Sequence, residues 1–202
     1  MSNTLSKSDF AAKISAATKK IEKNLDELNK LDAATGDGDH GTSILRVMKA
    51  ADAAAQTGGS FKEMLANVAM AVMSVGVGSA GPLIGSFFLG MGDAVDAEEL
   101  NAPEVAAMFR SGVAGLRKYS KAGIGDKTMM DAILPAVEVM EGKSELAALF
   151  VTAAEAAAKG AEATREMTAK FGRARNLGER TKGHMDAGAR SFSLIFAAFA
   201  EA

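Results

Sequence analysis

The sequence predicts an all-α protein, a single-domain barrel or bundle of about eight antiparallel amphipathic helices that spans residues 1–202. Apolar residues recur at helical spacing almost throughout the chain, and the alternation that is typical of strands is absent. The segments between the periodic stretches are short, which favours antiparallel neighbours. With 202 residues, 48% of them hydrophobic and 24% charged, the chain can bury the sizeable core of one domain.

Each expected helix has apolar residues three and four positions apart, as in residues 61–75. Two helices also have start signals, because Ser60 with Glu63 and Asn101 with Glu104 have the spacing of capping boxes. Glycine-rich segments separate several of the helices and would lie together where alternate connections share one end of a bundle. We expect helices at residues 7–31, 42–56, 61–76, 81–95, 102–120, 127–140, 145–168 and 187–201.

Composition narrows the possible functions. The formal net charge is −2, so no global field would draw the protein onto nucleic acid or an anionic membrane, and we expect it to bind neither. The chain has no cysteine, which excludes disulfides and thiolate chemistry. Neither a secretory signal nor a long charge-free apolar stretch is present at either end. We therefore expect a cytoplasmic protein.

Three aspartates, Asp32, Asp37 and Asp39, lie close together in a glycine-rich segment. Carboxylates drawn to within about 4 Å repel by roughly 4 kcal/mol per pair at an effective dielectric near 20, so the cluster invites a divalent cation. Oxygen ligands favour magnesium, manganese or calcium over zinc, and an EF-hand is excluded because Gly41 and Met48 stand where it needs carboxylates. An exposed acidic turn is the alternative. Because Asp32 lies on the inward stripe of the preceding helix, Mg²⁺ shared with a phosphate is the better interpretation.

Residues 76–81 match the dinucleotide-binding pattern G-x-G-x-x-G, but the helical periodicity before them argues against such a site. Glycines with Ser79 at a helix start can instead bind an anion through backbone N–H groups. Close helix packing through small residues is an equally good interpretation. Residues 123–128 also open a helix, but they lack the spacing of a Walker motif and can be simple capping.

The stretch from residue 165 to residue 182 carries an excess of basic residues. A solvated face is the usual explanation, and a glycine-interleaved loop that clamps phosphate is the alternative. For the two histidines, we assign His40 to nucleotide contact or support of the metal ligands, and His184 to a structural role. The basic residues are Arg165, Lys170, Arg173, Arg175, Arg180 and Lys182.

Four segments together resemble the L subunit family of dihydroxyacetone kinase, which binds nucleotide. They are residues 36–41 (Gly-Asp-Gly-Asp-His-Gly), 78–83 (Gly-Ser-Ala-Gly-Pro-Leu), 125–129 (Gly-Asp-Lys-Thr-Met) and 172–180 (Gly-Arg-Ala-Arg-Asn-Leu-Gly-Glu-Arg), the last followed by Gly183 and His184. Their order and spacing match the family over nearly the full length. The resemblance implies a barrel of eight antiparallel helices whose loops hold ADP or ATP and two Mg²⁺ ions at one end.

By position, the resemblance implies that Asp32, Asp37 and Asp39 ligate the metal ions. It assigns no residue a certain catalytic role, because the metal-bound nucleotide carries the chemistry. Two positions depart from the family: Ala80 stands where a serine is common, and Ala187 stands where some relatives have proline. The implied nucleotide contacts are His40, Gly41, Thr42, Ser43, Gly78, Ser79, Ala80, Gly81, Ser120, Met129, Arg173, Asp186, Ala187 and Gly188.

The resemblance also implies a phosphotransferase subunit that is inactive without a partner. It would transfer the γ-phosphoryl group to dihydroxyacetone held on a separate K subunit, and a phosphohistidine protein of the phosphoenolpyruvate-dependent system would recharge the bound ADP. Two alternatives stay open. One is an ATP-dependent kinase subunit for another acceptor, such as a tetrose, another short ketose or a fatty acyl group. The other is a nucleotide-loaded adaptor that binds a transcription regulator.

Overall fold

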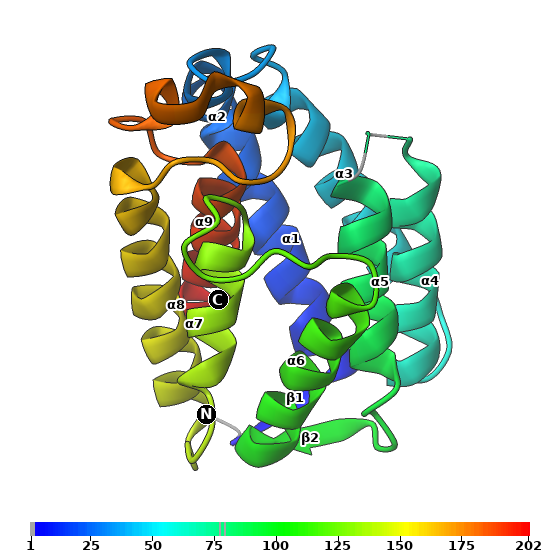
Figure 1. The fold of residues 1–202 in the computed structure, drawn as a ribbon. Helices are drawn as coiled ribbons and strands as arrows, with labels where there is room; N and C mark the ends of the chain where they lie inside the picture. Colours follow the sequence, from blue (N-terminus) through cyan, green and yellow to red (C-terminus); the bar gives the residue numbers. More distant parts are fainter. Residues whose placement is uncertain (1–2, 77, 79) are drawn as a thin grey trace.

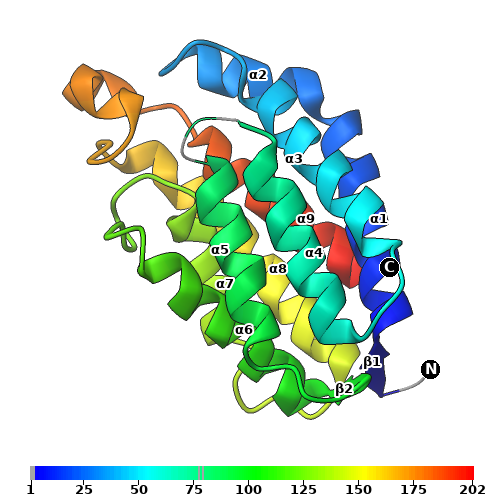
Figure 2. The same ribbon diagram turned by 90° about the vertical axis from the view of Figure 1, so that its right-hand side faces the viewer.

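The structure, a computed structural model, describes residues 3–76, 78 and 80–202. It confirms the predicted all-α class, and eight of the helices pack in a closed ring because α9 returns to contact α1 (Figures 1 and 2). Around the ring the order is α1, α3, α4, α5, α6, α7, α8 and α9, and α2 packs on α3 and α9. The helices are α1 (Lys7–Lys23), α2 (Leu25–Ala33), α3 (His40–Ala55), α4 (Phe61–Ser74), α5 (Ala80–Gly92), α6 (Ala102–Arg117), α7 (Met130–Glu138), α8 (Leu146–Ala163) and α9 (Ala187–Glu201), with 3₁₀ segments η1 (Thr164–Glu166) and η2 (Arg173–Thr181).

The two predicted capping boxes are confirmed. At the start of α4, the Glu63 N–H donates to the Ser60 hydroxyl (3.2 Å) and the Ser60 N–H donates to the Glu63 carboxylate (2.8 Å). At the start of α6, the Glu104 N–H donates to the Asn101 side chain (3.0 Å) and the Asn101 N–H donates to the Glu104 carboxylate (2.8 Å). Each box satisfies N–H groups that have no partner within the helix.

Three of the expected helices have different limits. The helix expected at residues 7–31 is divided at Asn24, whose side chain donates to the Lys20 carbonyl (2.7 Å). The helix expected at 127–140 begins only at Met130, because Lys127 has a φ of 59° that a helix cannot contain. The helix expected at 145–168 ends at Ala163 and continues as η1. The helix expected at 187–201 has these limits, and the other four differ from the expected limits by one to three residues at one or both ends, as side-chain periodicity alone allows.

Two short strands occur within the all-α fold, although the sequence shows no strand-like alternation. The strands β1 (Thr4–Ser6) and β2 (Glu99–Asn101) pair in antiparallel fashion, with Leu5 opposite Leu100. Three residues are too few to give a readable alternation, so the pattern of the sequence could not reveal them. The pair ties the segment before α1 to the start of α6, at one end of the ring (Figure 1).

Phenylalanine side chains fill the middle of the ring. Phe10 of α1 packs on Phe61 of α4 and on Phe199 of α9, with ring centroids 5.7 Å apart in both pairs. Phe109 of α6 contacts Phe10, Phe150 and Phe199 at similar distances. The loop after α2 and the segment η2 lie together at the end of the ring opposite the strands (Figure 1). Among the described residues, no helix combines the length and the apolar character needed to cross a bilayer.

Candidate functional site

The three predicted metal ligands converge at the loop end of the ring. Asp32 lies in the last turn of α2, Asp37 and Asp39 follow in the loop, and one carboxylate oxygen of each lies within 4.8 Å of the others. The Asp32 carboxylate accepts hydrogen bonds from the N–H groups of Gly38 (2.8 Å) and Asp39 (3.0 Å). Gly38 has a φ of 78°, a left-handed conformation that glycine adopts without strain. This oxygen-only set fits a hard divalent cation such as Mg²⁺.

A guanidinium group from a distant segment lies against these aspartates. Arg173, the first residue of η2, forms an ion pair with Asp37 and a longer one with Asp39, whose Oδ1 lies 3.7 Å from Nη2. Desolvation raises the pKa of the Asp37 carboxyl, but the hydrogen bond and the charge of Arg173 outweigh it and lower that pKa below its usual range. Clustered carboxylates need such a compensating cation to stay ionised together.

The residues that follow the aspartates begin α3 and are fixed to its neighbours. The His40 Nε2 atom lies 3.1 Å from the Ser191 hydroxyl of α9, and desolvation lowers the pKa of the imidazole, although the nearby Asp32 and Asp39 charges act in the opposite direction. The Thr42 N–H donates to the Asn29 side chain of α2 (3.1 Å). A Cβ atom on Gly41 would lie 2.3 Å from a backbone oxygen of α2, so only glycine permits this close approach.

A cavity of about 600 Å³ opens beside the aspartate cluster. Its walls come from the end of α2, the starts of α3, α5, α7 and α9, the segment after α6 and the segment around residue 172. The volume is in the range of small-molecule sites. The predicted site residues that line it are Asp32, His40, Ala80, Ser120, Met129, Arg173, Asp186, Ala187 and Gly188.

The remaining predicted residues lie next to these walls. Gly41, Thr42 and Ser43 belong to the first turns of α3, Asp37 and Asp39 adjoin Asp32, and Gly78 and Gly81 flank the start of α5. The prediction for Ser79 falls outside the described residues. The element before residues 76–81 is helix α4, as the periodicity of the sequence predicted, and not the strand that a dinucleotide-binding motif requires.

The start of α9 forms another part of the cavity wall. The Asp186 carboxylate caps this helix by accepting the Ala189 N–H (2.7 Å). Burial raises the pKa of Asp186 to about 6, although the capping hydrogen bond and the nearby Lys127 charge act in the opposite direction. A Cβ atom on Gly188 would lie 3.0 Å from the Asp186 carboxylate and 3.5 Å from the Met129 Cβ, so the two sides of this wall are in close contact.

Four of the basic residues at positions 165–182 form ion pairs of two kinds. Arg165, Lys170 and Lys182 form ion pairs with nearby acidic side chains at the surface, as a solvated face predicts. Arg173 instead reaches the aspartate cluster. The imidazole of His184 is exposed, while its backbone carbonyl accepts a hydrogen bond from Lys127, so the contact of this residue with the fold is made by the main chain.

Sequence reasoning missed several residues at the cavity. Tyr119 and Phe171 line it with 74% and 38% of their surfaces exposed, so neither contributes to an apolar stripe that would predict it. Lys127 also lines the cavity and is 3% exposed, whereas Asp131 is 1% exposed and lies behind the lining, where it accepts hydrogen bonds from the loop that contains Lys127. A charged residue at an inward helical position is the signal that would have marked Asp131, because such a group needs partners.

Comparison with known proteins agrees with this geometry. Residues 34–201 match the DAK2 domain family. The chain is 39% identical over 182 residues to the ADP-binding subunit DhaL of a PEP-dependent dihydroxyacetone kinase from Listeria innocua, covering 85% of this chain and 83% of the relative. It is also 39% identical over 173 residues to the corresponding DhaL subunit of Escherichia coli K12, covering 81% of each.

A solved structure is similar over nearly the whole chain. The dihydroxyacetone kinase of C. freundii, crystallised with AMP-PNP and Mg²⁺, superposes with a TM-score of 0.75 at 26% identity. The match covers 95% of this chain and 33% of that kinase, so the chain corresponds to about a third of the larger protein. The chain therefore belongs to the DAK2 domain family, as a dihydroxyacetone kinase subunit of the L type.

Proposed function

We propose that this subunit binds ADP or ATP with two Mg²⁺ ions in the cavity and transfers the γ-phosphoryl group to dihydroxyacetone held on a separate K subunit. The observation that carries the proposal is the convergence of three carboxylates beside a cavity of about 600 Å³. Relatives of similar length are named as ADP-binding subunits, which supports the same ligand here. The kinase of C. freundii was crystallised with a nucleotide analogue and Mg²⁺, which supports the metal.

In this proposal Asp32, Asp37 and Asp39 would hold the metal ions, which would supply positive charge that neutralises the phosphates of the nucleotide. Arg173 lies on the same carboxylates and supplies a further positive charge for phosphate oxygens. The residues at the starts of α3, α5 and α9 offer backbone N–H groups at helix N-termini, which bind anionic groups. The nucleotide contacts that we assign are those predicted from the sequence.

We infer dihydroxyacetone as the acceptor from the pattern of relatives. Those whose length the chain nearly covers are subunits of dihydroxyacetone kinases described as PEP-dependent or PTS-dependent. D-erythrulose kinase of Mycolicibacterium smegmatis is 34% identical, but the chain covers only 31% of it. On the same grounds we propose that a phosphohistidine protein recharges the bound ADP. The adaptor function toward a transcription regulator stays a prediction.

The decisive experiment measures nucleotide affinity in aspartate variants. We expect Asp32→Ala, Asp37→Ala and Asp39→Ala each to abolish Mg²⁺-dependent ADP binding in calorimetry, because the metal loses a ligand and the phosphates lose their counter-charge. Circular dichroism should show nearly unchanged helical content, since these side chains are outside the hydrophobic core. Asp96→Ala is the matched control, because this carboxylate is 92% exposed and its ion pair with Lys62 is long, at 3.9 Å.

Undiminished ADP affinity in all three variants would show that the site assignment is wrong. Phosphoryl transfer to dihydroxyacetone should be measured with the K subunit and the phosphohistidine donor added together. Transfer that survives Asp37→Ala would contradict the proposed mechanism. Retention of ADP through purification would support recharging on the protein, whereas free exchange would favour direct use of ATP.

A further inference from the structure

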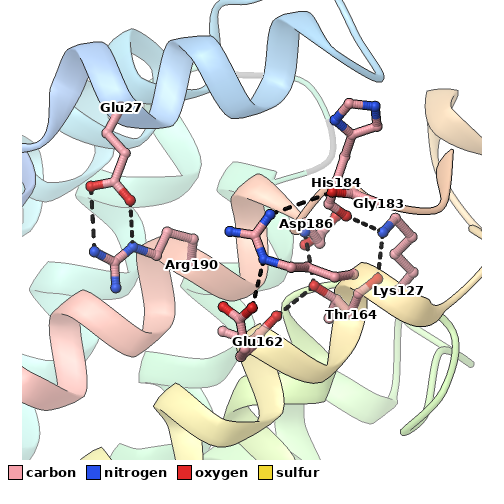
Figure 3. A network of polar contacts seen from close by, with 10 residues as sticks. Glu27, Lys127, Glu162, Thr164, Gly183, His184, Asp186 and Arg190 are labelled. Carbon is pink, nitrogen blue, oxygen red and sulfur yellow. Dashed lines mark hydrogen bonds and ion pairs between the residues drawn. The ribbon is translucent and has the colours of Figure 1, made fainter.

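A buried lysine lies in the loop before α7. Lys127 is 3% exposed, and its Nζ atom donates hydrogen bonds to the backbone carbonyl oxygens of Thr164 and His184 (Figure 3). A buried ammonium group is costly unless it is hydrogen-bonded, and these two carbonyls supply that compensation. The lysine belongs to none of the contacts that the resemblance to the family implied.

The backbone around Lys127 is held in an unusual conformation. Its φ of 59° is in the left-handed region, which a side chain other than glycine, asparagine or aspartate rarely adopts. The buried Asp131 carboxylate fixes the loop by accepting the N–H groups of Gly125 (2.6 Å) and Thr128 (2.8 Å). The loop thus has a defined shape that directs the lysine inward, and its strain indicates a constraint beyond ordinary packing.

The two acceptors of Lys127 belong to segments that are joined to each other. The Thr164 hydroxyl accepts the Asp186 N–H (2.9 Å), and the Gly183 N–H donates to the Arg165 carbonyl (2.8 Å). The segment before α9 is therefore fixed to the end of α8, and Lys127 connects both to the loop before α7. Figure 3 shows Lys127, Thr164, His184 and Asp186 gathered around this junction.

The joined segments form one wall of the cavity. Met129 comes from the loop before α7, and Asp186 and Gly188 come from the start of α9; all three line the cavity together with Lys127. The Cβ position of Gly188 is 3.5 Å from the Met129 Cβ, so a small shift between the two segments would change the shape of the wall. Hydrogen bonds from Lys127 oppose such a shift.

We propose that Lys127 is a positioning residue for the nucleoside diphosphate: its ammonium group joins the loop at residues 123–129 to the turn at residues 183–188 and so holds the cavity wall in its binding shape. The inference rests on the nucleotide site proposed above. Lys127 does not itself ligate the metal ions or touch the reacting phosphate. It acts through the relative placement of Met129 and Gly188.

Lys127→Met tests the proposal, because methionine keeps the backbone strain and most of the side-chain volume and removes the hydrogen-bonding charge. We expect Mg²⁺-dependent ADP binding by the full chain to weaken by about tenfold or more, which corresponds to about 1.4 kcal/mol. Lys170→Met is the matched control. The Lys170 Nζ atom lies 2.9 Å from Asp126 of the same loop, but the Lys170 side chain is 61% exposed. The affinity of the Lys170→Met variant for ADP should therefore change by less than about twofold.

A general loss of stability must be separated from a loss of positioning. Val105→Ala removes buried methyl groups from α6 and should lower the melting temperature without weakening ADP binding, because Val105 packs in the core and does not line the cavity. If Val105→Ala weakens ADP binding as much as Lys127→Met does, the proposal is overturned. An unchanged affinity in Lys127→Met overturns it too. Should Lys127→Met fail to fold, Lys127→Gln keeps one donor and is judged by the same criteria.

Hydrogen exchange provides a readout that is independent of the nucleotide. In Lys127→Met without ADP, the amides of residues 183–189 should lose protection while those of α4 and α6 keep theirs. Unchanged protection at residues 183–189 would refute the junction. If the wild-type chain itself binds no ADP, the proposed function fails, and the exchange pattern alone then decides whether Lys127 joins the two segments.

Discussion

Replacement of Asp186 by asparagine should make the stability of the protein less sensitive to pH. Burial raises the pKa of this carboxyl from its ordinary value of 3.8 to about 6 in the folded state. The folded protein therefore holds the proton more tightly than the unfolded chain does. Stability from this proton is fully present below pH 3.8 and is lost as the pH rises through 6. Asparagine keeps an oxygen that can cap α9 but has no proton to lose.

The size of the effect follows from the two pKa values. A difference of about two units corresponds to about 3 kcal/mol in the free energy of unfolding, of which about 2 kcal/mol falls between pH 4.5 and pH 7. We expect the wild type to lose this amount relative to Asp186→Asn over that range. Urea unfolding of both proteins, without Mg²⁺ and nucleotide, measures the difference at each pH, and the other titrating groups cancel because both proteins contain them.

A difference between the two proteins that does not change with pH would refute this reasoning. It would mean that Lys127 and the capping N–H group stabilise the Asp186 carboxylate in the folded protein as strongly as water does in the unfolded chain. A difference that grows with pH in favour of the wild type would reverse the sign, and the capping bond would then outweigh the cost of burial.

Two further substitutions test the packing and the charge of the site. Gly160→Ala should destabilise the fold by about 1–3 kcal/mol in urea unfolding, because the new Cβ would lie 1.9 Å from a backbone oxygen of α7, whereas Gly58→Ala, which meets nothing within 4 Å, should be nearly neutral. Arg173→Gln should tighten the binding of Mg²⁺ alone several-fold, because it removes the cation that pairs with the aspartates, and should weaken the binding of ADP, because the phosphates lose a positive charge. Calorimetry measures both affinities, with Arg175→Gln as the control. Weaker Mg²⁺ binding by Arg173→Gln would contradict the assignment.

Much of the architecture could be predicted from the sequence. Helical periodicity identified the long helices, and the capping boxes at Ser60 and Asn101 fixed two of their starts, since both signals are local. The spacing of Asp32, Asp37 and Asp39 predicted their convergence because glycines between them allow one tight loop. Residues such as Ser120 and Gly188 could be assigned to the same cavity only through the resemblance to a family.

What escaped prediction depends on contacts between distant segments. The break at Asn24 follows a side-chain bond to the main chain that competes with the helix, and apolar spacing continues across it. The strands β1 and β2 are too short to show alternation, and their pairing joins residues that are far apart in the chain. Lys127 was expected to be the first residue of a helix, and nothing local in the sequence indicates that its acceptors lie at Thr164 and His184.

The closed ring has a consequence for how the protein matures during synthesis. The cavity combines Asp32 of α2 with Gly188 of α9, so a nascent chain that ends before residue 188 lacks part of the site. Folding has to wait for contacts of high sequence separation, which slows it. A ribosome-bound chain that lacks α9 would expose the apolar faces of α1 and α8 and lack one wall of the cavity, so ligand binding can stabilise the fold only once α9 has been made.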